Sequence, residues 1–92
     1  MEFEITIYVE NKSYRMEVKR IYQGDSIEKF EVTGGSRSII IRNNRPALKR
    51  QRGHKKPVWL MEGDERPKNP QTFALTVLAI EKKIDEFEKE PK

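Results

Sequence analysis

The chain has 92 residues and no cysteine, and its 19 Lys or Arg against 15 Asp or Glu give a net charge of +4. This length favours one domain with a modest core, and the absence of cysteine excludes disulfides, thiol catalysis and cysteine-bound zinc. Charged residues make up 37% of the chain, but its hydrophobic residues are periodic, which is typical of a folded domain and not of a disordered chain. We therefore expect one folded domain over residues 1–92.

The N-terminal segment has the period of a half-buried strand. In Glu2–Glu10, hydrophobic residues alternate with polar ones, and acidic residues stand where a signal peptide would be basic. No hydrophobic run reaches the roughly 18 residues needed to span a bilayer, and the basic stretch described below lacks an amphipathic anchor. These features predict a soluble, cytoplasmic protein with no membrane partner.

A first hairpin is predicted from the alternation of hydrophobic residues. A turn at Asn11-Lys12 joins the first strand to a second strand over Tyr14–Tyr22, and this register places Glu4 opposite Lys19. The alternation breaks at Arg20-Ile21, where we expect a bulge or the end of the strand.

A second hairpin follows a cluster of turn residues at 23–26. Its strands are Ile27–Thr33 and Arg37–Arg42, and they are joined at Gly34-Gly35, where we expect two residues with positive φ. The residues predicted to share the inner face are Phe30, Val32, Ile39 and Ile41. Ile40 then points to the outer face, where it is either exposed or a sign that this face is also covered.

The next segment, Asn43–Pro57, has no hydrophobic period and contains two prolines and a glycine, so it is predicted to be a long loop. A short additional strand near Ala47–Arg50 is an alternative. Val58–Met61 is predicted to be the last strand, and Trp59 is its largest side chain.

A C-terminal helix is predicted over about residues 70–89, with Asn69 suited to capping and Pro70 to the first helical position. Its hydrophobic stripe consists of Phe73, Val77, Ile80, Ile84 and Phe87, widened by Ala74 and Leu78. Leu75 lies roughly opposite the stripe and is a candidate contact with another chain. The order of elements predicts an α+β fold, an antiparallel four- to five-stranded meander sheet with the C-terminal helix packed on one face.

Concentrated positive charge is the strongest functional feature of the sequence. Residues 32–61 hold eight basic residues and no acidic residue, while the segment on either side is slightly acidic. Arg suits phosphate because its planar fork donates two hydrogen bonds at once. We therefore predict contact with a polyanion, with nucleic acid as the first candidate. The predicted phosphate-binding residues are Arg42, Arg45, Lys49, Arg50, Arg52, Lys55 and Lys56, with Trp59 and the outward-facing Tyr8 as stacking candidates.

The sequence favours a non-enzymatic binding module without a metal or cofactor. His54 is the only histidine, cations that oppose its protonation surround it, and no orienting carboxylate is near it in sequence. Glu62, Asp64 and Glu65 are more typical of a solvated turn than of a metal site. The alternative hypothesis is a protein-interaction or homodimerisation domain that would use Leu75 or an open sheet edge.

The segment from Arg37 to Gly63 also resembles a family of short, uncharacterised bacterial proteins. The shared features are a strand running into Asn43-Asn44-Arg45-Pro46, a basic loop, and Trp59 followed by Glu62-Gly63 before a C-terminal helix. The resemblance implies a similar fold over most of the chain. It implies no activity, so no site residue is carried over from it.

Overall fold

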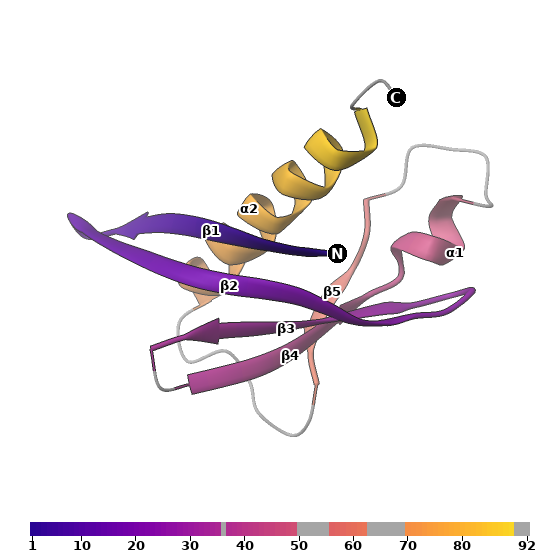
Figure 1. The fold of residues 1–92 in the computed structure, drawn as a ribbon, viewed down its shortest axis with the longest axis horizontal. Helices are drawn as coiled ribbons and strands as arrows, with labels where there is room; N and C mark the ends of the chain where they lie inside the picture. The colour runs from indigo at the N-terminus through magenta and orange to yellow at the C-terminus, as the bar shows by residue number, and fades with distance from the viewer. Residues whose placement is uncertain (36, 50–55, 63–69, 90–92) are drawn as a thin grey trace.

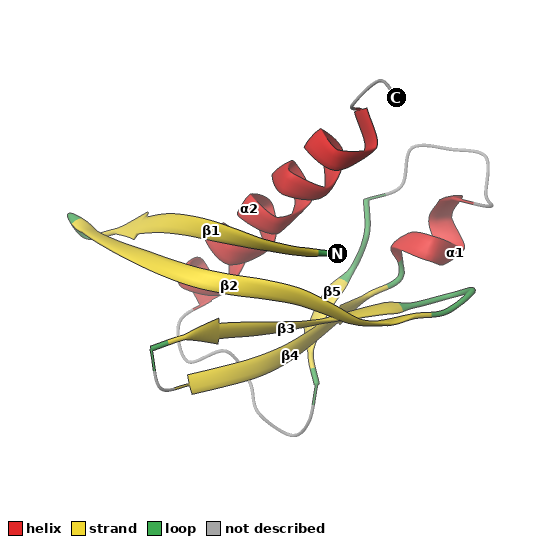
Figure 2. Ribbon diagram, in the orientation of Figure 1, coloured by secondary structure: helices red, strands yellow, loops and turns green. Residues whose placement is uncertain are grey.

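The computed structural model describes residues 1–35, 37–49, 56–62 and 70–89. The elements in chain order are β1 (Glu2–Val9), β2 (Lys12–Gln23), β3 (Glu28–Gly34), β4 (Arg37–Asn43), α1 (Arg45–Lys49), β5 (Trp59–Met61) and α2 (Pro70–Lys89). The strands form one antiparallel sheet in the order β1-β2-β3-β4-β5, and α2 crosses one face of it (Figure 1). The predicted α+β meander with a C-terminal helix is confirmed, and Figure 2 shows α1 as a second, short helix.

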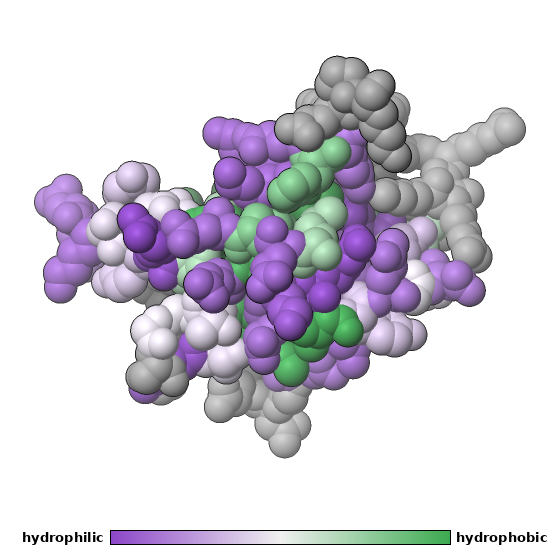
Figure 3. Space-filling model, viewed as in Figure 1, coloured by the Kyte–Doolittle hydropathy of each residue, from purple (hydrophilic) through white to green (hydrophobic). Residues whose placement is uncertain are grey.

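The face of the sheet that packs against α2 is the inner face, and it forms the core. Phe30, Ile41 and Ile80 are fully buried there, as the alternation and the helical stripe predicted. The buried cluster takes at least one residue from every strand and consists of Ile5, Val18, Phe30, Val32, Ile41, Trp59, Val77, Ile80 and Ile84. Over the visible surface, hydrophilic residues predominate and hydrophobic residues form separate patches (Figure 3).

The first hairpin differs from its predicted register by two residues. Its turn is Glu10-Asn11, and both residues have positive φ (50° and 66°). Glu4 consequently lies opposite Glu17 and not Lys19, and its Oε1 is 3.2 Å from Arg15 Nε. The inward residues keep their face, because a shift of two residues preserves the period of a strand.

The second hairpin turns one residue later than predicted. Gly34 is the last residue of β3 and pairs with Arg37, whereas Gly35 has the positive φ (62°). Ser36 lies outside the described residues. The predicted break in β2 is a bulge, because the register between β2 and β3 shifts between Arg20 and Tyr22.

The segment predicted to be a long loop, Asn43–Pro57, contains the end of β4 at Asn43 and the helix α1, so the loop prediction is wrong for these residues. The alternative of a strand near Ala47–Arg50 is wrong for Ala47–Lys49. Two asparagines start this helix. Arg45 N donates to Asn43 Oδ1 (2.8 Å), and Leu48 N donates to the carbonyl oxygen of Asn44 (3.2 Å). Pro46 is compatible with the first turn, where an N–H has no intrahelical acceptor.

The helix α2 begins at Pro70, as predicted, while Asn69 lies outside the described residues. Val77, Ile80 and Ile84 are buried, and Phe87 at the end of the stripe packs on Phe3 of β1, with 5.9 Å between the ring centroids. This contact joins the last turns of the helix to an edge strand of the sheet.

The flanks of the stripe differ from the prediction. Ala74 and Leu78 are exposed, and Leu78 retains 61% of its accessible surface, whereas Leu75 is half-buried. The buried arc of the helix is rotated toward Thr76, whose hydroxyl donates to the carbonyl oxygen of Thr72 (2.8 Å) and so needs no water. Of the two leucines, Leu78 is therefore the exposed one and not Leu75.

Candidate nucleic-acid interface

One end of the sheet, here called the basic end, brings together the β2–β3 loop, the end of β4 and α1 (Figure 1). Ala47 N in α1 donates to the carbonyl oxygen of Ser26 in the β2–β3 loop (3.3 Å). Val58 N donates to Asn44 Oδ1 (2.8 Å), which ties together the two ends of residues 45–57, here called the basic segment. The basic segment therefore leaves and rejoins the sheet at the same place.

The inner face of the basic end holds a buried ion-pair network. Glu28 and Asn43 lie opposite each other on β3 and β4 and are 1% and 2% exposed. Arg45 Nε donates to Glu28 Oε2 (2.6 Å), and Arg45 Nη1 donates to Glu88 Oε1 (2.8 Å). Arg20 Nη1 lies 3.7 Å from Glu28 Oε1. The network thus connects β2, β3, α1 and α2.

The charge of Arg45 is balanced within the fold. Its side chain is 14% exposed. Burial opposes the charged form, but the hydrogen bonds to Glu28 and Glu88, together with the attraction of their negative charges, outweigh burial and raise the pKa of Arg45 above its ordinary value. A guanidinium held by two carboxylates is not free to bind phosphate, so the phosphate-binding role predicted for Arg45 does not fit its position.

Asn43 serves the same local structure. Its Oδ1 accepts the hydrogen bond from Arg45 N that starts α1, while its Nδ2 is buried and has no partner among the described residues. A buried amide group without a partner destabilises the fold, whereas the hydrogen bond from Arg45 N to Asn43 Oδ1 stabilises the start of α1.

Trp59 is a core residue. Its side chain lies on the inner face opposite Asn43, is 9% exposed, and packs on Phe30 with 5.8 Å between the ring centroids. The indole Nε1 donates to Glu81 Oε2 of α2 (3.3 Å). A ring enclosed in this way presents no open face to a base, so the stacking role predicted for Trp59 does not fit its position.

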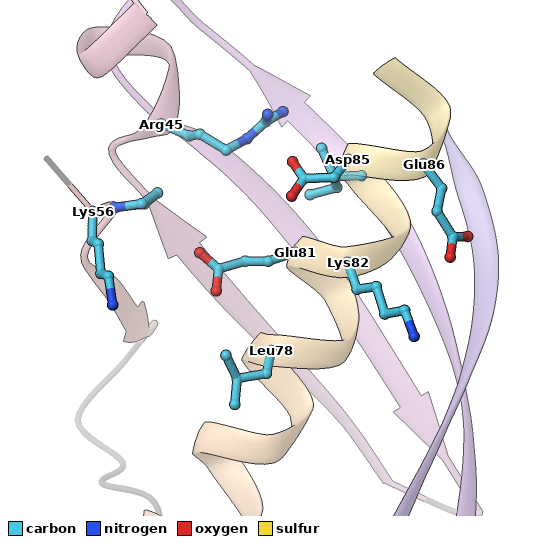
Figure 4. A pocket seen from close by; sticks show the side chains of 9 residues that line it. Arg45, Lys56, Leu78, Glu81, Lys82, Asp85 and Glu86 are labelled. Carbon is cyan, nitrogen blue, oxygen red and sulfur yellow. The ribbon is translucent and has the colours of Figure 1, made fainter. Parts of the chain in front are cut away.

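A groove of about 830 Å³ runs between α2 and residues 56–57 (Figure 4). Glu81 and Asp85 of α2 point toward the side of the groove formed by Arg45 and Lys56, while Lys82 points away from it (Figure 4). The groove therefore offers a polyanion as many carboxylates as cations. Its mixed charge makes it a poor phosphate site, even though Lys56 was among the predicted phosphate ligands.

The outer face of the basic end carries a row of residues that are directly opposed on successive strands. The outer row consists of Tyr22 on β2, Lys29 on β3, Arg42 on β4 and Leu60 on β5. Tyr22 is 50% exposed and Leu60 is 49% exposed. Arg42 is exposed and forms no ion pair with any carboxylate in the described part of the chain. Lys29 Nζ donates to Glu62 Oε1 (2.7 Å) and lies 5.8 Å from the centroid of the Tyr22 ring.

The bulge in β2 decides the face on which Tyr22 lies. In a regular strand Tyr22 would share a face with Val18, which is fully buried. Because the bulge inserts Ile21, Tyr22 lies opposite Lys29 on the outer face instead. Tyr22 is not among the residues that the sequence predicts for the site, because a period of two places it inside. The broken alternation at Arg20-Ile21 was the signal that could have found it.

The structure separates the residues that the sequence grouped as one binding set. Arg42 lies on the outer face and Lys56 lies in the groove, while Lys49 ends α1 and its side chain is not described. Tyr8 is 73% exposed, but it lies on the β1–β2 hairpin, opposite Ser13 and away from the basic end. Three residues of the predicted phosphate-binding set lie outside the described residues, namely Arg50, Arg52 and Lys55. The same holds for His54, Asp64 and Glu65, which were considered for catalysis or metal binding.

Two further observations concern chemistry and membranes. Within residues 1–35, 37–49, 56–62 and 70–89, no group of three or more His, Asp or Glu side chains is placed to hold a metal ion. Neither helix in the described part of the chain is long and apolar enough to cross a membrane.

Comparison with known proteins yields no relative. No protein-family model, no curated protein and no solved structure matches the chain. The resemblance to a family of short bacterial proteins therefore stays a prediction.

Proposed function

We propose that the protein is a non-enzymatic module that binds nucleic acid through the phosphate backbone at its basic end. One observation carries the proposal. The basic segment contains six Lys or Arg and no Asp or Glu. The hydrogen bond from Val58 N to Asn44 Oδ1 holds the two ends of this segment together at the sheet. Positive charge confined to one end of a small domain attracts a polyanion and accelerates its association.

The proposed phosphate-binding set is smaller than the set that the sequence suggested. Arg45 and Trp59 serve the fold, so neither belongs to it. Lys56 lies in the groove of mixed charge and is left out as well. The remaining members are Arg42, Lys49, Arg50, Arg52 and Lys55. This set keeps cations of both kinds, and Arg can bind a phosphate with two hydrogen bonds where Lys offers a point charge.

The proposal is tested by fluorescence anisotropy with labelled single-stranded DNA, duplex DNA and RNA over a series of salt concentrations. Neutralisation of about five phosphates would lower the affinity for duplex DNA roughly 500-fold between about 50 and 200 mM salt. Replacing Arg50 and Arg52 together with Ala should reduce the salt slope for duplex DNA by about 1.8. If the protein binds none of the three ligands at low salt, the proposal is wrong.

A matched control removes the same charge from another part of the chain. Lys12 and Arg15 are exposed on the β1–β2 hairpin, far along β2 from the basic end. Replacing both with Ala lowers the net charge by the same amount and should leave the salt slope unchanged. Equal losses in the two double variants would show that only the overall charge matters.

Leu78 favours a second candidate function, a protein-interaction or homodimerisation domain. It is 61% exposed and lines the groove beside α2. Self-association through Leu78 should persist at high salt and disappear in Leu78→Glu, as measured by sedimentation velocity. A wild-type protein that stays monomeric at high concentration would argue against a homodimer.

A further inference from the structure

Tyr22 is a half-exposed aromatic residue that the fold holds in a defined position. A Cβ atom at Gly24 would lie 2.7 Å from the Tyr22 hydroxyl oxygen, so the ring lies close over the Gly24 backbone in this conformation. Gly24 itself is fixed, because its N–H donates to the carbonyl oxygen of Ile27 (2.8 Å). The ammonium group of Lys29 adds a contact 5.8 Å from the ring centroid. The ring is thus positioned before any ligand arrives.

The charges around this ring suit a phosphate backbone. The charge of Lys29 is matched by Glu62, and Glu31 in the neighbouring cross-strand row lies opposite Lys19 on β2. Arg42 lies two strands from Tyr22, roughly 10 Å away. It is the cation of the outer row that has no carboxylate partner in the described part of the chain.

The bulge supports a functional reading of this arrangement. A regular β2 would turn Tyr22 toward the core, and the inserted Ile21 turns it outward, into the same cross-strand row as Arg42, with Lys29 between them. Bulges that re-aim a side chain are typical of functional sites. An aromatic face, a guanidinium without a carboxylate partner among the described residues, and the two described ends of an acid-free segment thus lie at one end of the molecule.

We propose that the nucleic acid is single-stranded, DNA or RNA, and that it crosses the outer face with a base stacked on Tyr22 and a phosphate on Arg42. Bases in a duplex are stacked on one another and offer an aromatic side chain only their edges, whereas an unpaired base offers a π face. A polyanion without bases would contact Arg42 and gain nothing from Tyr22. The inference rests on the proposed function and adds the form of nucleic acid that is bound.

The test uses Tyr22→Leu, which removes the aromatic ring and keeps a hydrophobic side chain. Affinity for a labelled single-stranded oligonucleotide should fall roughly 5- to 150-fold, the range for one lost base stack, with an unchanged salt slope. Affinity for duplex DNA and for inorganic polyphosphate should change by less than about twofold, because neither presents an unstacked base. Tyr22→Phe keeps the ring and should bind as the wild type does.

Tyr8→Leu is the matched control. Tyr8 is also an exposed tyrosine on the outer face, but it lies opposite Ser13, roughly 30 Å from Tyr22 along β2. Its replacement should leave the affinity for single strands unchanged. A measurement on the wild type does not depend on how well the variants fold: on addition of the oligonucleotide, NMR signals of the Tyr22 ring should shift and those of Tyr8 should not.

The outcomes separate the inference from the function on which it rests. If no oligonucleotide binds at low salt, the proposed function fails and takes the inference with it. If oligonucleotides bind with a salt-dependent affinity that Tyr22→Leu leaves unchanged, or lowers equally for single strands and duplex, the inference is overturned and the proposed function stands. Unshifted Tyr22 signals in the bound state overturn the inference as well.

Discussion

The two faces of the sheet at the basic end use their arginines in opposite ways. Arg45 faces Glu28 and Glu88 and is 14% exposed, whereas Arg42 lies on the outer face and is exposed. The two residues are close neighbours in a stretch that looks uniformly basic in the sequence. The contrast teaches that basic residues divide into those that hold the fold together and those left for a ligand. A basic residue stabilises the fold where the fold places a carboxylate against it, and it can bind a ligand where the fold places none.

The two faces also depend on each other. The bonds from Arg45 to Glu28 and from Ala47 N to Ser26 hold α1 against the end of the sheet, where the basic segment begins. A buried ion pair adds little net stability over a hydrophobic replacement, but breaking one partner is costly. The inner network is thus better understood as a device that fixes where the basic segment starts than as a source of stability.

The largest expected effect comes from Arg45→Ala. It leaves Glu28 buried with Arg20 as its remaining cation, 3.7 Å away, so the free energy of unfolding should fall by about 3 kcal/mol. Urea unfolding followed by circular dichroism measures this loss. Where the variant stays folded, its salt slope for duplex DNA should equal that of the wild type. A stability loss below about 0.5 kcal/mol, the range of ordinary surface substitutions, would erase the contrast between the two faces.

A smaller effect is expected for Asn44→Ala, which removes the tie between the two ends of the basic segment. The lost acceptor for Val58 N should cost about 1 kcal/mol or less, because Val58 is 56% exposed and water can replace the bond. Affinity for nucleic acid should fall with an unchanged salt slope, since the cations remain and only their arrangement loosens. Unchanged affinity would mean that the hydrogen bond between Val58 and Asn44 does not matter for binding. The proposed function would then lose the observation that supports it.

The sequence predicts the fold because its hydrophobic residues alternate through four strands. The inner residues Phe30 and Ile41 follow directly from that period. The register of the first hairpin does not, because its turn begins with Glu10 at a positive φ, a conformation that glutamate rarely adopts and that its identity does not signal. The period of two still assigns the residues of β1, and those of β2 before its bulge, to the correct face of the sheet, even though the position of the turn between them was predicted wrongly.

The site could be predicted only in part, because tertiary contacts decide it. A helix as short as α1 has no hydrophobic period, and its start depends on bonds to Asn43 and from Ala47 to Ser26. The side of the sheet on which Tyr22 lies depends on the exact position of one inserted residue. The sequence therefore shows that positive charge is concentrated in one stretch, but it cannot tell that Arg45 pairs with carboxylates inside the fold while Arg42 stays exposed.

The smallest expected effect on stability, and the sharpest test of the comparison, comes from Arg42→Ala. Its side chain is exposed, so the free energy of unfolding should change by less than about 0.5 kcal/mol. The salt slope for single-stranded DNA should fall by about 0.7, the contribution of one phosphate, while Arg42→Lys should keep the slope because it keeps the charge. If Arg42→Ala binds single strands with an unchanged slope while the double replacement of Arg50 and Arg52 abolishes binding, the nucleic acid stays on the basic segment and never reaches the outer face. Tyr22 would then be an exposed residue without a ligand, and the division of arginines between the two faces would concern folding alone.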